Sequence, residues 1–416
     1  MNILYKSALV ILSLSSLQAI TLKELINKTL ETNQNLKADN FTQKAKYKSF
    51  ESVKNLYNPN VIVGANYNRL DLDVRNVQVK TTYTGFAKFS MNLYDGGKSK
   101  ALKNQKKYEY EAQKFQNITS KKELILNLVT LYFNLKTINE NIKVFEEKSK
   151  ALKARYEREK TKYDMKMSAI DEVLKLKSEY EANLYTIEEL KYQKIELTKN
   201  IELLSGVEIN SLDTKKIPDI SDLTYSETSD IKALKLNLKA SEENINIVKS
   251  IKKPQIKLED NLNFYEYGNY NERLLSDLPD KQNQFSLNLT YNLFDTSSKE
   301  KIEVTKLSKL SIANKISFAT KQAKTDFFLA KRKVKTQILK LKSQKSAVEM
   351  ANSVYEIIKS KYENDLVDNI TYLDALSKKI YNLALYKQAL NDLEIAKANY
   401  YFKSGLDYKE VLKKCR

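Results

Sequence analysis

The stretch from Lys98 to Ser205 contains neither glycine nor proline, and its apolar residues follow a seven-residue repeat. Between Leu124 and Phe145 they recur at alternating spacings of four and three, and a second such register begins at Val173. This period keeps one helix face towards a partner helix, as in a coiled coil. Between the two registers the pattern loses phase. The sequence therefore predicts two antiparallel helices that meet at a tip near residues 164–169, the first ~100 Å long at ~1.5 Å per residue.

The composition supports a few very long elements. The 416 residues include only 7 glycines and 4 prolines. A charged fraction of 30% and a mean hydropathy of −0.54 exclude a helical membrane protein. The chain has no histidine and a single cysteine, Cys415, which excludes histidine acid–base chemistry, a disulfide framework and a His- or Cys-ligated metal site. The net charge of +19 is spread along the chain, and we interpret it as a lysine-rich bias.

The N-terminus resembles a secretory signal peptide. Lys6 precedes a short apolar segment, residues 7–17, and Ala19 ends a site suited to cleavage. The segment is too short for a membrane anchor, and the residue directly after the cleavage site is Ile20, not the cysteine of a lipoprotein. We therefore expect residues 1–19 to be removed and the mature chain to be exported, which argues against a nucleic-acid partner.

Four segments alternate between apolar and polar residues: 61–70, 83–94, 256–266 and 284–294. Their lengths match the ~9–11 residues of a tilted β-strand that crosses a bilayer. Since a barrel needs about eight strands to close, several chains would pool their strands. A soluble four-stranded sheet with one wet face is the alternative. The residues predicted to face lipid are Val61, Val63, Tyr67, Phe89, Met91, Leu93, Leu258, Leu262, Phe264, Phe285, Leu287, Leu289, Tyr291 and Leu293.

The chain reads as an internal duplication. Pro59 and Pro254, Asp95 and Asp295, and two Ser-Gly pairs recur about 200 residues apart. Each half is predicted to contain a helix, two strands, a very long helix and a shorter helix. The predicted division is a first repeat, 20–206, with helix 21–57 and hairpin 98–205; a linker, 207–228; a second repeat, 229–405, with hairpin 297–404; and a tail, 406–416.

This ordered combination resembles the TolC-type channels of the outer membrane efflux protein family. The residues that carry the resemblance include "LYDGGKSK" and "LFDTSSKEK" after the second strand of each repeat, and "KYENDLVDNITYLDALSKKIYNLALYKQAL". The resemblance implies a homotrimer with a twelve-strand β-barrel in outer-membrane lipid and a coiled-coil α-helical tunnel in the periplasm. It also implies a passive duct, with no catalytic residue, cofactor or metal, which docks a periplasmic membrane-fusion adaptor and an RND or ABC pump.

The resemblance further implies that the helix tips close the tunnel through a tyrosine and acidic residues. By position, Tyr362 matches the family's tyrosine and Asp374 one acidic residue, and Asp368 could form a further polar link. The gate candidates beside the first tip are Tyr163, Asp171 and Glu172. Packing of the tyrosines within the helix seam and solvation of the acids are the alternatives.

The sequence departs from the family's gate at four positions. Lys166 and Asp365 stand where the family has tip glycines, Val367 replaces an arginine, and Thr371 replaces a second acidic residue. We therefore expect a different clamp at the tips.

Three functions stay open from the sequence. The favoured one is an exit duct for efflux of small molecules such as drugs, detergents and bile-type compounds. The same duct could serve type I protein secretion. An exported periplasmic coiled-coil scaffold is the alternative of another class. For a duct, residues 71–82 and 268–283 would form extracellular loops, and adaptors would dock near residues 155–180 and 355–380.

Overall fold

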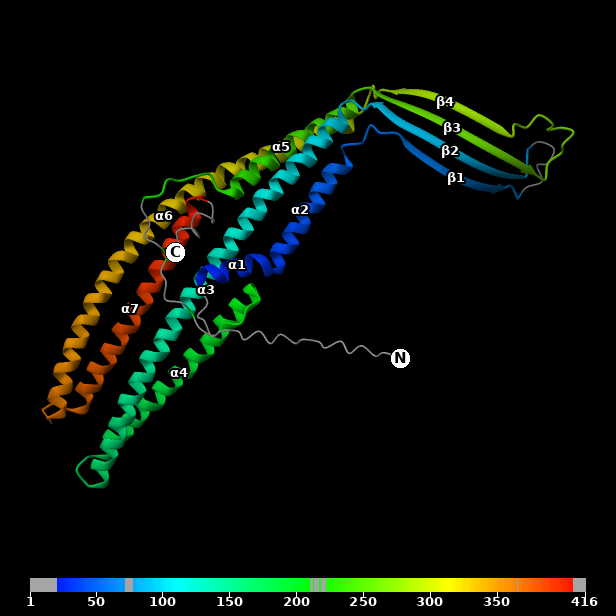
Figure 1. The fold of residues 1–416 in the computed structure, drawn as a ribbon. Helices are drawn as coiled ribbons and strands as arrows, with labels where there is room; N and C mark the ends of the chain where they lie inside the picture. The colour runs from blue at the N-terminus through cyan, green and yellow to red at the C-terminus, as the bar shows by residue number, and fades with distance from the viewer. Residues whose placement is uncertain are drawn as a thin grey trace, which may run out of the picture. The chain divides into compact units, whose positions relative to one another are not determined.

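The computed structural model describes residues 21–71, 78–209, 212, 217, 222–364 and 366–406 (Figure 1). The predicted signal peptide, part of the first predicted loop and nearly all of the predicted tail lie outside these residues. The elements are α1 (Leu22–Thr32), α2 (Gln34–Ser52), β1 (Asn60–Arg69), β2 (Thr81–Tyr94), α3 (Lys98–Asp164), α4 (Ile170–Ser205), α5 (Ser229–Lys249), a 3-10 helix η1 (Ser250–Lys252), β3 (Gln255–Gly268), β4 (Lys281–Thr290), α6 (Thr296–Glu363) and α7 (Asn369–Lys403).

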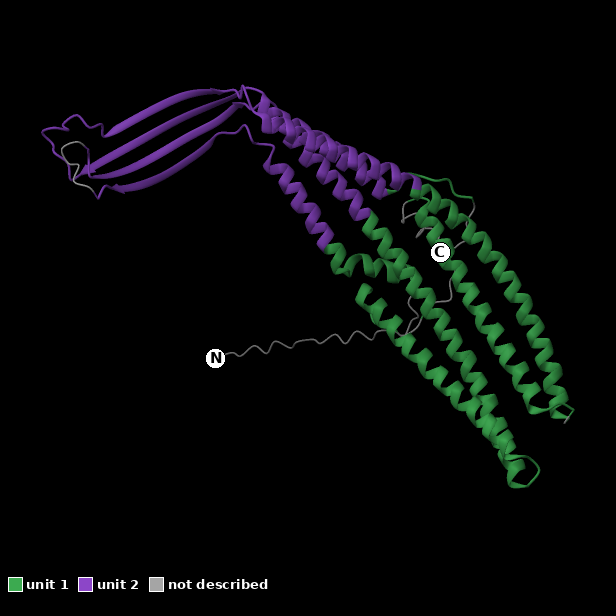
Figure 2. Ribbon diagram, turned by 180° about the vertical axis from the view of Figure 1, so that it is seen from behind, with its two compact units in different colours: residues 1–37, 119–228, 322–416 green, residues 38–118, 229–321 purple. Residues whose placement is uncertain are grey.

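The chain forms two compact units (Figure 2). Unit 1 consists of residues 1–37, 119–228 and 322–416, and unit 2 of residues 38–118 and 229–321. Each unit therefore combines segments of both predicted repeats, and α3 and α6 run from one unit into the other.

The predicted long hairpins are present. Helix α3 has 67 residues and α6 has 68, which at ~1.5 Å per residue makes each ~100 Å long. The tip between α3 and α4 lies where the sequence predicted it, and there Lys166 adopts a left-handed conformation with φ 61°. Its amide donates to the Tyr163 carbonyl at 2.8 Å. A lysine thus occupies the left-handed position for which glycine is the usual residue.

The prediction of one continuous helix over 21–57 was wrong. The helix breaks at Asn33, whose side chain accepts from the Leu36 amide at 3.2 Å and donates to the Leu204 carbonyl at 2.9 Å. Thr32 Oγ1 also donates to the Ser205 carbonyl at 2.6 Å. These bonds join the α1–α2 junction to the last turn of α4. Asn33 breaks the helix because its side chain starts a new one.

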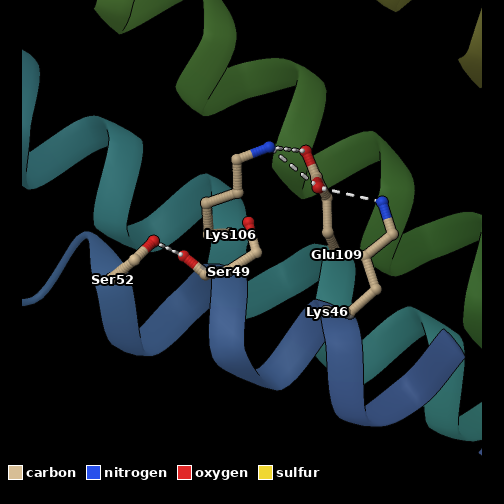
Figure 3. A network of polar contacts seen from close by, with 5 residues as sticks. All are labelled: Lys46, Ser49, Ser52, Lys106 and Glu109. Atoms are coloured by element: carbon tan, nitrogen blue, oxygen red, sulfur yellow. Dashed lines mark hydrogen bonds and ion pairs between the residues drawn. The ribbon is translucent and has the colours of Figure 1, made fainter. Parts of the chain in front are cut away.

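Helix α2 also ends at Ser52, before the predicted end at Tyr57. Near this end it is tied to α3 by Glu109, whose carboxylate lies 3.3 Å from Lys46 Nζ and 3.1 Å from Lys106 Nζ (Figure 3). Ser52 Oγ donates back to the Ser49 carbonyl at 2.9 Å. The chain then turns, and Tyr57 Oη donates to Asp95 Oδ1 at 3.0 Å.

Both strand-to-helix motifs cap the long helices. Asp95 accepts from the Gly97 amide at 3.1 Å and the Ser99 amide at 2.7 Å. At the corresponding position, Asp295 accepts from the Ser298 amide at 3.2 Å and from the Ser297 hydroxyl at 2.8 Å. These aspartates satisfy amides at the starts of α3 and α6 that have no partner within the helix.

The four strands form one antiparallel sheet in the order β1-β2-β3-β4. Met91 pairs with Leu258, and Leu258 pairs with Leu287, so the register gathers the apolar sets of neighbouring strands on one face. We call this the apolar face and the opposite one the polar face. Asp260, between Phe89 and Phe285, is an exception that the alternation did not predict. Strand β4 ends at Thr290, so Tyr291 and Leu293 lie beyond it, contrary to the predicted strand 284–294.

Unit 1 holds two apolar clusters. The first packs α1 against α3 and α4 around Leu25, Leu128 and Phe133, each fully buried, and includes Ile217 of the predicted linker. The Ile217 amide donates to Glu394 Oε2 of α7 at 2.6 Å. The second cluster joins both hairpins near their tips. It positions the candidate site.

Candidate functional site at the hairpin tips

The second cluster of unit 1 contains two stacked tyrosines. Tyr362 comes from the last turn of α6 and Tyr372 from the first turn of α7, and their ring centres lie 4.9 Å apart. Both side chains are buried, Tyr372 at 2% exposure. The sequence placed Tyr362 at the gate by resemblance, but gave no signal for Tyr372.

An arginine of the other hairpin lies against both rings. The guanidinium carbon of Arg155, from α3, is 4.6 Å from the ring centre of Tyr362 and 4.6 Å from that of Tyr372. Its side chain is only 13% exposed, and Nη2 lies 3.9 Å from Glu363 Oε1. A largely desolvated cation–π contact contributes roughly 2 kcal/mol. Arg155 thus links the first hairpin to the second, although Val367 stands where the family has its arginine.

Tyr355 extends the cluster along α6. Its hydroxyl lies 3.3 Å from that of Tyr372, and Lys379 Nζ lies 4.0 Å from its ring centre. Burial, followed by the bond to Tyr372, raises the pKa of the Tyr355 hydroxyl well above its usual value. We call Arg155, Tyr355, Tyr362 and Tyr372 the tip clamp.

The predicted acidic candidates have different surroundings. Glu172 Oε2, on α4, accepts from Asn369 Nδ2 of α7 at 3.3 Å, which is a second link between the hairpins. Asp368 caps α7 and accepts from the Thr371 amide at 2.8 Å, and the bonds with Thr371 lower the pKa of this carboxyl. Asp374 pairs with Lys378 at 2.7 Å on an exposed surface.

Two candidates lie apart from the tip clamp. Tyr163 is 41% exposed on the last turn of α3, and Asp171 is exposed in the first turn of α4. Of the predicted residues, the structure thus brings only Tyr362 into the clamp. A possible sequence signal for Arg155 was its rarity, since only seven of the 71 basic residues are arginines.

Within the described ranges, no helix is long and apolar enough to cross a membrane. Among the same residues, no cluster of Cys, Asp or Glu side chains is arranged to hold a metal ion.

Comparison by sequence finds a family model that matches part of the chain. Residues 25–207 match the model of the family described as outer membrane efflux protein. The predicted resemblance to this family is confirmed. Among curated proteins, no sequence matches. Outer membrane efflux proteins are channels rather than enzymes, which agrees with the prediction of a non-catalytic chain. The match also supports the predicted localisation in the outer membrane with a large periplasmic helical part.

Comparison by structure extends the likeness over nearly the whole chain. The CmeC outer membrane channel of Campylobacter jejuni has a TM-score of 0.83 at 16% identity, over 95% of this chain and 89% of that one. The outer membrane protein VceC of Vibrio cholerae has a TM-score of 0.77 at 13% identity, over 92% of this chain and 96% of that one. The open-state MtrE channel of Neisseria gonorrhoeae has a TM-score of 0.76 at 16% identity, over 93% of this chain and 89% of that one. The predicted fold class, long helical hairpins with four antiparallel strands per chain, is confirmed.

Proposed function

We propose that the chain is the exit duct of a tripartite efflux system and passively conducts small molecules out through the outer membrane. The observation that carries this proposal is the sheet in unit 2. One face is apolar and exposed, with Val63 at 75% and Leu289 at 70%, and the other is polar. A water-filled barrel in lipid requires this alternation.

The sheet also has two open edges, β1 and β4. In a bilayer every backbone amide and carbonyl needs a partner, so an open edge is not tolerated. Pairing β1 of one chain with β4 of the next removes both edges, and three chains supply the twelve strands of the predicted barrel. The homotrimer is therefore part of the proposal.

Helix α6 offers a surface for the same assembly. Its exposed apolar side chains include Val304, Leu307, Leu310, Phe318, Phe328, Leu329, Ile338 and Leu339. An apolar row of this length on one helix is typical of a surface that another subunit covers. Ile338 stands four residues after Val334 and three before Leu341, a heptad spacing that predicts a place in the seam of its own hairpin. In the structure it is 51% exposed. We assign it to the interface between protomers.

The tip clamp supports a gate at the periplasmic end. Arg155 and the link from Glu172 to Asn369 hold the two hairpins of one chain together, so an open tip requires both links to change. Tyr163, Asp171 and Asp374 are exposed at the same end and would meet neighbouring protomers or the adaptor. The partners in this proposal are a periplasmic membrane-fusion adaptor and an inner-membrane RND or ABC pump.

Two measurements test the function. The purified protein, reconstituted in planar bilayers, should conduct ions, and a strain that lacks the protein should retain a fluorescent efflux dye and regain export when it is restored. Unchanged dye export together with loss of one secreted protein would instead assign the duct to type I secretion. A chain that remains in solution without detergent and does not conduct would contradict the duct and favour a periplasmic scaffold.

A further inference from the structure

The apolar face of the sheet contains a groove of about 510 Å³ in unit 2. Its floor is formed where Ala65 of β1 pairs with Gly85 of β2. A Cβ atom added at Gly85 would meet nothing within 4 Å, so the space above this residue is open. Apart from Ala87, the neighbouring positions of this face carry larger side chains. Ala65 and Gly85 therefore leave a notch beside these larger side chains.

Aromatic rings form the walls of the groove. Tyr67 and Tyr83 lie on the side of β1 and β2, with ring centres 5.1 Å apart. Phe264 of β3, which pairs with Gly85, forms the opposite wall and is 49% exposed. By strand alternation these side chains belong to the apolar face, which the proposed function turns towards lipid.

Charged side chains border the groove towards the ends of the strands farthest from the helices. Lys281 of β4 pairs with Phe264, and its Nζ lies 5.6 Å from that ring centre. Arg69 follows Tyr67 by two residues on the same face of β1. Glu266 is the one carboxylate among the lining residues. The two cations outnumber this carboxylate, so the border favours an anion.

We propose that this groove is a binding site for one acyl chain of an anionic phospholipid, with the phosphate held at Lys281 and with Arg69 adding positive charge at the border. The proposal rests on the proposed function, because only an outward-facing apolar face meets lipid. A second copy of the chain is not the occupant, since it would pair at the edges of β1 or β4, whereas the groove is centred on β2. A flexible acyl chain fits an irregular apolar notch beside aromatic rings, and an ammonium and a guanidinium bind phosphate.

The test uses native mass spectrometry of the full-length assembly released from detergent, titrated with phosphatidylglycerol or phosphatidylcholine. The wild type should bind phosphatidylglycerol more tightly than phosphatidylcholine, because the head group of the first is anionic, whereas the ammonium of the second offsets the charge of its phosphate. Gly85→Leu fills the open space and should weaken the first binding step by about tenfold for both lipids, since the displaced chain loses buried methylenes. Gly85→Ala should give a smaller loss. The matched control is Ala87→Leu on the same strand and face but outside the lining, which should bind like the wild type.

Lys281→Gln tests the head group separately. It should weaken phosphatidylglycerol more than phosphatidylcholine, whose ammonium offsets the charge of its phosphate, and so reduce the preference for phosphatidylglycerol. Equal binding by the wild type and Gly85→Leu would overturn the acyl-chain site, and an unchanged preference in Lys281→Gln would overturn the phosphate site. The same spectra report the number of chains in the assembly. A trimer that shows none of these lipid effects would contradict only the proposed lipid binding in the groove. The absence of a trimer would contradict the proposed function.

Discussion

The guanidinium of Arg155 lies 4.6 Å from the ring centre of Tyr362, although Arg155 belongs to α3 and Tyr362 to α6. The contact joins the last third of one ~100 Å helix to the last turn of the other. Since the two helices belong to different hairpins, this pair couples the tips of the hairpins in one chain. It is the strongest candidate for a gate contact among the described residues.

Arg155→Ala should loosen the tip. It removes the cation that contacts both tyrosines, and we expect a loss of about 2 kcal/mol in local stability. Hydrogen exchange of residues 355–380 should accelerate, and the conductance of the reconstituted protein should rise. Arg155→Lys should be intermediate, because an ammonium keeps the charge but not the planar stacking. Arg158→Ala, an exposed arginine on the same helix, is the control, and an equal effect there would contradict a specific clamp.

The cap of α6 should respond to acid. Hydrogen bonds from Ser298 and Ser297 lower the pKa of Asp295 to about 2 from the ordinary value of 3.8. A carboxyl whose pKa is lowered in the folded state stabilises it above the ordinary pKa, and that contribution is lost as pH falls through the folded pKa. The first turn of α6 should therefore fray between about pH 3.8 and pH 2.

Hydrogen exchange of residues 296–302 across this window measures the effect on the cap. Asp295→Ala should show little protection from exchange at neutral pH, relative to the intrinsic rate, and no further loss of protection in acid. A first turn that responds to acid equally in the variant and the wild type would contradict the assignment to Asp295.

Two glycines at equivalent places in the repeats should differ in how well they tolerate substitution by alanine. Gly405, after α7, has φ +81°, and an added Cβ would lie 2.3 Å from the Ser226 carbonyl oxygen. Gly206, after α4, has φ +66°, but its nearest neighbour, Thr32, is at an ordinary 3.5 Å. Alanine at Gly206 meets only backbone strain of about 1 kcal/mol, whereas alanine at Gly405 also displaces backbone. Gly405→Ala should lower the melting temperature more than Gly206→Ala; equal losses would contradict the close approach.

The charges on the polar face of the sheet should determine whether the proposed channel prefers cations or anions. Glu259 lies 2.7 Å from Lys257 Nζ and 3.4 Å from Lys88 Nζ, and Asn288 Nδ2 donates to it at 3.0 Å. Glu259→Gln leaves two lysines without this carboxylate in each chain. The reversal potential in a salt gradient should therefore shift towards anion selectivity. Glu266→Gln, on the opposite face of the same strand, should leave it unchanged, and a shift there would contradict the assigned orientation.

The sequence predicted the long hairpins, the first tip and the four strands because each depends on a local period. Heptads mark α3 and α4, alternation marks β2 and β3, and Asp-Gly-Gly marks the turn before Lys98. The same reasoning failed where a single side chain redirected the backbone. Asn33 breaks the first helix by capping the next one, and no periodic pattern in the sequence indicates this break.

Tertiary contacts also could not be predicted from the sequence. Ile338 fits the heptad seam of α6 but is exposed, because a period identifies an apolar face and not the helix that covers it. Tyr362 could be assigned from the family resemblance. Its contacts with Arg155 and Tyr372 could not, since they depend on how two hairpins approach each other.

In the proposed channel, three chains pool their strands into one barrel. The detergent-corrected mass of the protein extracted from membranes tests this assembly. We expect a species of three chains, each slightly below 48.2 kDa after removal of the signal peptide. A monomer or dimer that stays in solution without detergent would contradict it, and the four strands would then form an ordinary sheet on a periplasmic scaffold.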